Sequence, residues 1–91
     1  MARIRTIKPE FFMSDDIGSL TVMSRLLYVA LWCHVDGEGK LQFRRTALAA
    51  QCFPFEMDSF DDCLLELVNK GLVRRYIAKG KQYLDIPTFT D

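Results

Sequence analysis

The sequence predicts a single α+β domain with three main helices, a short amino-terminal helix and a small antiparallel sheet. Three observations favour this fold class. The chain has 91 residues, of which 49% are hydrophobic and 26% charged, so it has ordinary globular composition and room for one core. Apolar residues recur at helical spacing in some segments and alternate with polar residues in others. Glycine and proline fall between these segments or at their ends.

Residues 1–19 are interpreted as an amino-terminal arm with a short helix, and residues 20–91 as the main body of the same globular domain. Pro9 suits the first turn of a helix, and Glu10 lies near its positive end. We expect Phe11 and Phe12 to hold the arm against the body.

The most apolar segment, 21–35, predicts the central helix of the core. Ser19 or Thr21 is a candidate amino-terminal cap. One polar seam runs along this helix, and its residues are Thr21, Ser24, Arg25 and Tyr28. The turn residues of 36–39 end the helix.

The remaining pattern predicts, in order, a strand at 40–43, helices at 46–52 and 59–70, and strands at 73–78 and 82–86. Gly71 is placed to end the last helix in a left-handed conformation, and Lys79-Gly80-Lys81 forms a tight hairpin. This order of elements is typical of a winged helix-turn-helix, in which the hairpin is the wing.

A set of segments resembles, in the same order, phage replisome-organiser and replication-initiation proteins, whose fold is related to the DnaD amino-terminal domain. The segments are Ile7–Phe12, Leu26–Trp32, Asp36–Gly39, Phe53–Phe55, Leu64–Val68, Lys70–Val73 and Tyr83–Pro87. The resemblance implies an intracellular winged-helix domain that acts on phage or prophage DNA, in replication or in transcription regulation, with no catalytic residues. It implies the bacterial host cytoplasm as the location.

In winged helices the third helix usually enters the major groove. Here its exposed stripe is acidic, because it holds Asp58, Asp61, Asp62 and Glu66 beside Asn69. Carboxylates repel phosphates, so ordinary major-groove docking is unfavourable. Three interpretations stay open for these acids: a solvated face, a surface for a basic protein partner, and direct reading of cytosine.

The basic residues that we expect to contact double-stranded DNA lie elsewhere. They are Arg74, Arg75, Lys79 and Lys81 around the hairpin, Arg44 and Arg45 before the second main helix, and Arg3, Arg5 and Lys8 in the arm. The alternative for each is a solubilising surface charge. The net charge is zero, so the DNA hypothesis requires that the fold bring these cations together.

Other functions have weaker support. The chain has one histidine and no glycine loop of the kind that cradles phosphates, so we expect no enzyme and no cofactor. Neither Asp15-Asp16 nor Cys33-His34 has the spacing of a metal site, and Cys33, Cys52 and Cys63 are interpreted as buried thiols of a reducing cytosol. No stretch is apolar enough for a membrane span or a secretory signal. A protein-interaction module, as a homodimer or with a replication or regulatory partner, is the alternative function.

Overall fold

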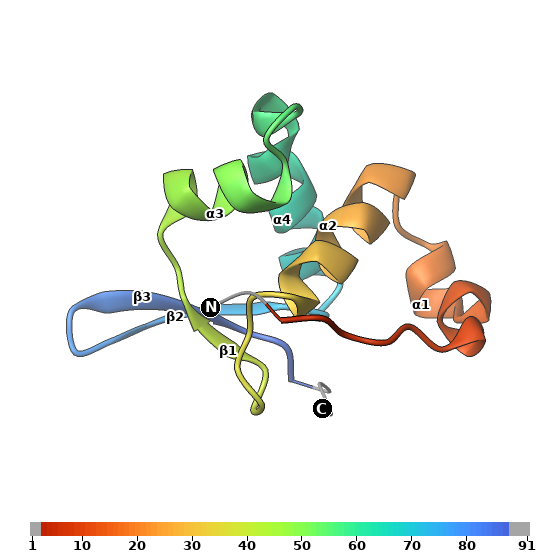
Figure 1. The fold of residues 1–91 in the computed structure, drawn as a ribbon, viewed down its shortest axis with the longest axis horizontal. Coiled ribbons are helices and arrows are strands. Elements are labelled where there is room, and N and C mark those ends of the chain that lie inside the picture. Colours follow the sequence, from red (N-terminus) through yellow and green to blue (C-terminus); the bar gives the residue numbers. More distant parts are fainter. Residues whose placement is uncertain (1–2, 88–91) are drawn as a thin grey trace.

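The computed structural model describes residues 3–87 as an α+β domain (Figure 1). The helices of this range are two 3-10 helices, η1 (Pro9–Met13) and η2 (Met57–Ser59), and four α-helices, α1 (Asp15–Gly18), α2 (Val22–Trp32), α3 (Arg45–Cys52) and α4 (Phe60–Asn69). The strands are β1 (Lys40–Gln42), β2 (Arg74–Ala78) and β3 (Lys81–Asp85). None of the helices in residues 3–87 has the length and apolar character needed to cross a membrane.

The three strands form one antiparallel sheet in the order β1-β3-β2. Leu84 at the centre of β3 faces Leu41 on one side and Arg75 on the other. Figure 1 shows α2, α3 and α4 on the same side of this sheet, with the β2–β3 hairpin projecting beyond them. The element order and the strand pairing are compatible with a winged helix.

The core lies between these helices and the sheet. Phe53, Leu27, Leu67 and Leu84 are each 1% exposed or less, and they come from the end of α3, from α2, from α4 and from β3. Burial of one such side chain contributes about 1.5–3 kcal/mol to the free energy of unfolding. The main elements are therefore held together by one shared hydrophobic cluster.

Helix α2 confirms the expected central helix but corrects its polar seam. Thr21 caps the helix, because its hydroxyl accepts a hydrogen bond from the Ser24 amide. Ser24 and Tyr28, expected in a polar seam, are buried at 0% and 5% exposure, whereas Val22 is 72% exposed. The sequence pattern assigned polar side chains to the exposed face of the helix. Ser24 is buried instead, because its hydroxyl bonds to Glu66 of α4.

The amino-terminal segment forms η1 and α1 rather than one short helix. Phe11 packs against Trp32 and Tyr28 of α2, with ring centroids 5.1 and 6.2 Å away. Phe12 is 69% exposed and stacks edge-on against Phe11. Of the two aromatic residues expected to hold the arm, only Phe11 does so directly.

The remaining elements begin and end within a few residues of their expected positions. Helix α4 is preceded by the 3-10 turn η2, so its α-helical part starts at Phe60. Gly71 has a φ of 77° and ends the helix as expected, because this left-handed conformation favours glycine.

Candidate nucleic-acid interface

The tip of the β2–β3 hairpin is a two-residue turn. Ala78 pairs with Lys81, so Lys79 and Gly80 are the central residues, and both have positive φ, 52° and 74°. Two central residues with positive φ define the type I′ turn, whose twist matches that of the flanking strands. The sequence predicted the tight hairpin and the role of glycine. Lys79, which has a Cβ, occupies the other left-handed position.

Strand alternation places Arg74 and Arg75 on opposite faces of the sheet. Arg74 pairs with Asp85 and Arg75 pairs with Leu84, whose side chain is in the core. Arg75 therefore lies on the face that carries the helices, and Arg74 on the other, which we call the outer sheet face. Two adjacent arginines that the sequence grouped together thus serve different surfaces.

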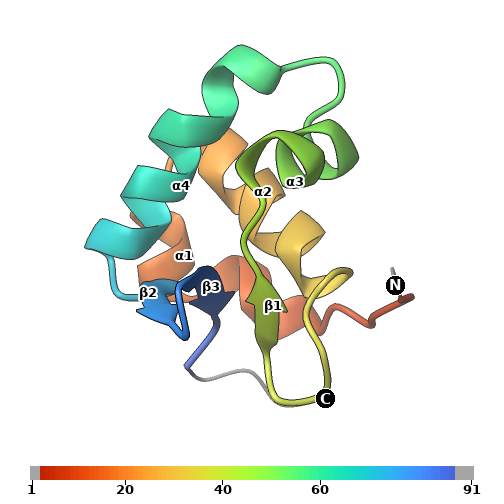
Figure 2. The same ribbon diagram turned by 90° about the vertical axis from the view of Figure 1, so that its left-hand side faces the viewer.

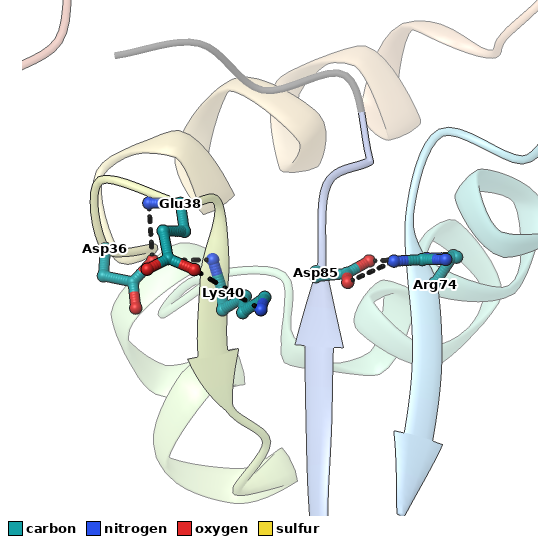
Figure 3. Close-up of polar contacts among 5 residues, drawn as sticks. All are labelled: Asp36, Glu38, Lys40, Arg74 and Asp85. Atoms are coloured by element: carbon teal, nitrogen blue, oxygen red, sulfur yellow. Dashed lines mark hydrogen bonds and ion pairs between the residues drawn. The ribbon is translucent and has the colours of Figure 1, made fainter.

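Arg74 is engaged with a buried carboxylate. Its Nε and Nη2 donate to Oδ1 and Oδ2 of Asp85 at 2.9 and 2.7 Å, and Asp85 is only 4% exposed (Figure 3). The hydrogen bonds from Arg74 hold the pKa of Asp85 below its ordinary value, against the opposing effect of burial. Because a buried carboxylate needs such a partner, Arg74 has an internal role.

Arg75 is exposed and lies over the aromatic ring of Phe43. Its guanidinium carbon is 4.7 Å from the ring centroid, and Nη2 donates to Oε1 of Gln82 at 3.0 Å. This cation–π contact orients the side chain while leaving the charge unneutralised. Nothing in the sequence linked Arg75 to Phe43, because the contact depends on how β1 pairs with β3.

Arg45 lies next to this position and is paired with an acid. Its Nε and Nη2 donate to the two carboxylate oxygens of Asp61 at 3.0 and 2.8 Å. Its guanidinium carbon is 5.9 Å from the centroid of the Phe60 ring, which stacks on Phe43 at 6.5 Å. The hydrogen bond from Arg45 lowers the pKa of Asp61, and the charge of Arg75 adds to this effect.

Arg45, Arg75 and Asp61 thus lie together between the hairpin and the start of α3, and Arg44 precedes Arg45 in the chain; we call these four residues the wing-base cluster. Arg44 follows Phe43 in the chain and is exposed, and within residues 3–87 no hydrogen bond or ion pair engages its side chain. Three cations exceed the two nearby carboxylates, Asp61 and Asp58, whose charge also acts on Arg45, so a positive charge remains here. The structure therefore brings Arg45 and Arg75 together beside the hairpin, with Arg44 next to Arg45 in the chain.

The arm does not join this cluster. Arg5 donates from Nε to the Trp32 carbonyl at 3.0 Å and from Nη2 to the Val35 carbonyl at 2.9 Å. The amide of Arg3 donates to the Cys33 carbonyl at 2.7 Å. These contacts satisfy carbonyls at the carboxyl end of α2, where a cation also complements the helix dipole. In Figure 2 the red arm runs on the β1 side of the sheet, away from β2. Lys8 is exposed in the arm.

Not all acids of the predicted acidic stripe of α4 face outward, because Glu66 binds to α2. Glu66 accepts hydrogen bonds from the Thr21 amide and hydroxyl, both at 2.9 Å, and from the Ser24 hydroxyl at 2.6 Å. The Ser24 bond is the main reason why the pKa of Glu66 is lowered. Glu66 therefore caps α2 from a neighbouring helix. Leu65, at 57% exposure, takes its place in the outward stripe.

Of the four acids expected to bind a partner, Asp58 and Asp62 are exposed with no ion pair or hydrogen bond to other residues of 3–87. Asp61 is held by Arg45 and Glu66 by α2, as described. Two acids thus remain at the beginning of α4 for an external interaction.

In residues 3–87, no three His, Cys, Asp or Glu side chains are placed to hold a metal ion. Burial lowers the pKa of His34, and it raises that of Cys52 to about 11. Cys63 is buried, but Cys33 and Cys52 are only half-buried.

Comparison of the chain with protein-family models, with curated proteins and with solved structures found no match.

Proposed function

We propose that this chain is the winged-helix DNA-binding domain of a phage or prophage replication-initiation or regulatory protein. In this proposal it has no catalytic role and acts in the cytoplasm of the bacterial host. It binds double-stranded DNA through phosphates, with the hairpin as the wing. The observation that carries the proposal is the wing-base cluster, where Arg44 and Arg75 keep their charge beside the exposed hairpin.

The charges favour an approach from the hairpin rather than by α4. Asp58 and Asp62 at the start of α4 would repel the phosphates on both sides of a major groove. Arg44, Arg75 and Lys79 offer cations without such neighbours, apart from Asp61. Phosphate contacts position a protein on DNA but carry no sequence information. The domain alone is therefore expected to bind duplexes of different sequence with similar, salt-sensitive affinity.

The test is fluorescence anisotropy with a labelled duplex over a range of salt concentrations. The double variant Arg44→Gln/Arg75→Gln should reduce the slope of log Kobs against log salt by about 1.8, that is about 0.9 for each lost phosphate contact. Lys70→Gln is the matched control, because it removes an exposed cation beyond the end of α4. No duplex binding by the wild type at low salt, or equal slopes for the double variant and the wild type, would refute the proposal.

A second candidate, a protein-interaction module, is favoured by the exposed stripe of α4. Leu65 is 57% exposed and Phe55, before the helix, is 93% exposed, and the free acids Asp58 and Asp62 are near them in the chain. Apolar side chains with acids around them suit a partner with a basic rim. Light scattering tests the homodimer form, for which Leu65→Ser should shift the mass toward the monomer. A wild type that is monomeric at the highest soluble concentration would exclude it.

A further inference from the structure

The outer sheet face carries a tyrosine pair. Tyr76 of β2 and Tyr83 of β3 are register partners, with ring centroids 5.7 Å apart and planes 22° apart. Both side chains are half-buried, and α2, α3 and α4 lie on the other side of the sheet. The duplex-binding proposal does not use this pair.

Polar and cationic groups surround the two rings. Gln42 is the register partner of Tyr83 on β1, and Lys81 lies two residues before Tyr83 on the same face of β3. On the other side, Lys40, Asp85 and Arg74 form a row across the three strands (Figure 3). Residues two apart on a strand are about 7 Å from each other. The tyrosine pair is therefore bordered by a lysine on one side and by this row on the other.

The row is positive on balance. The bidentate bond with Arg74 neutralises Asp85, and the carboxylate is buried. Lys40 contacts Glu38 at 3.5 Å, but both side chains are largely exposed, so solvent screens this ion pair and an anion can replace Glu38. Lys40 and Lys81 thus remain as cations at the two ends of the tyrosine pair.

A shallow depression lies beside Tyr76, at the edge strand of the sheet. Its volume is about 580 Å³, and its lining includes Tyr76, Arg74, Arg75, Lys40 and Asp85 together with Val68 of α4 and Gly71 beyond its end. An aromatic ring thus stands next to open space with cations within reach. This combination has the chemistry of a site for a planar base attached to a phosphate.

We infer that the outer sheet face binds single-stranded DNA. One or two unpaired bases stack on the Tyr76–Tyr83 pair, and the flanking phosphates contact Lys81 and Lys40. A duplex does not fit this description, because its bases are stacked on one another and show no free face to a side chain. An apolar peptide does not fit either, because charged and amide groups surround the rings. The tyrosine pair and the two lysines are separate from Arg44 and Arg45 of the wing-base cluster, whereas Arg75 of that cluster also lines the depression.

The experiment measures fluorescence anisotropy with an oligothymidylate of about 12 nucleotides, a length within the site sizes of single-strand binders. Tyr76→Leu and Tyr83→Leu keep apolar bulk but remove the stacking face, and each should weaken binding about five-fold or more. Lys81→Gln should reduce the salt slope for the oligonucleotide by about 0.7. Arg44→Gln is the matched control, because Arg44 is an exposed cation that does not line the depression, and it should leave oligothymidylate binding unchanged.

A measurement on the wild type keeps the test valid if the leucine variants unfold. In carbon–proton NMR spectra, the ring signals of Tyr76 and Tyr83, assigned with single Tyr→Phe variants, should shift as oligothymidylate is added. The inference is overturned if the wild type does not bind the oligonucleotide at low salt, or if these ring signals stay in place. It is also overturned if Arg44→Gln weakens single-strand and duplex binding equally, since both ligands would then share the wing-base cluster. Duplex binding is measured in parallel, so each proposal can fail without the other.

Discussion

Substitutions of Lys79 can distinguish the effect of its backbone conformation on folding stability from the effect of its charge on DNA binding. Its φ of 52° lies in the left-handed region, which costs a residue with a Cβ about 1–2 kcal/mol. Asparagine tolerates this conformation better, and Asn-Gly is the preferred pair in a type I′ turn. If asparagine recovers about half of the cost, Lys79→Asn should raise the free energy of unfolding by about 0.5–1 kcal/mol. For a domain of this size, that is a rise in Tm of about 2–8 °C.

Lys79→Gln is the matched control, because it removes the same charge without relieving the backbone. We expect it to leave Tm close to that of the wild type. Both variants lose the ammonium group, so both should reduce the salt slope for duplex binding by about 0.9 if Lys79 contacts a phosphate. Thermal unfolding followed by circular dichroism, with anisotropy titrations on the same samples, measures both effects.

The Tm tests the backbone strain at Lys79, and the salt slope tests its contact with DNA. Equal Tm values for Lys79→Asn and Lys79→Gln would show that the left-handed conformation carries no recoverable strain. An unchanged salt slope in both variants would show that the tip of the wing does not contact the DNA. A more stable protein that binds DNA less well is the expected outcome.

Three further predictions concern the contacts between elements. Ser24→Ala removes a buried hydroxyl that donates to a carboxylate, and it should lower the free energy of unfolding by about 1.5–3 kcal/mol in urea titrations. The pKa values of Glu66 and Asp85 are lower in the folded state than in the unfolded state. Their contribution to stability is therefore complete when the pH is above their pKa in the unfolded state, and it is lost as the pH falls through their pKa in the folded state. Tm should therefore decrease below about pH 4.5, and less steeply in Glu66→Gln; a parallel decrease in both proteins would contradict the role of Glu66. Asp61→Asn frees Arg45 and removes a carboxylate from the wing-base cluster, so duplex affinity should increase, and an unchanged or lower affinity would contradict this use of Arg45.

Element positions were predictable from the sequence because they depend on local pattern. Helix α4 follows the spacing of Phe60, Cys63, Leu64 and Leu67, all of which are buried, and Gly71 ends it in the left-handed conformation. Helix α2 was less well predicted. A polar residue, Ser24, is buried because it bonds to Glu66 of the neighbouring helix α4, whereas the apolar Val22 is exposed.

The candidate site was predictable only as a set of charges. Arg74 and Arg75 are neighbours in the chain, and alternation alone separates them onto two faces. Which of the two keeps its charge depends on register, because Asp85 lies opposite Arg74 and nothing acidic lies opposite Arg75. The role of Arg5 could not be predicted either, since it requires the arm to reach the end of α2.

Two ion pairs also explain how a chain with zero net charge can present unpaired cations around the hairpin. The pairs Arg74–Asp85 and Arg45–Asp61 each neutralise one cation and one carboxylate, although Arg74, Arg45 and Asp61 stay exposed. Arg44, Arg75, Lys79 and Lys81 then remain around the hairpin, while Asp58 and Asp62 remain at the start of α4. The two signs meet at the wing-base cluster, where Asp61 binds Arg45 and the charge of Asp58 also acts on Arg45, so the hairpin carries the cations that lie farthest along the chain from these acids. In the proposed function, a duplex is attracted by the hairpin cations and repelled by the acids of the helix that would otherwise enter its major groove. This difference in charge is the physical reason to expect phosphate contacts without reading of bases by α4.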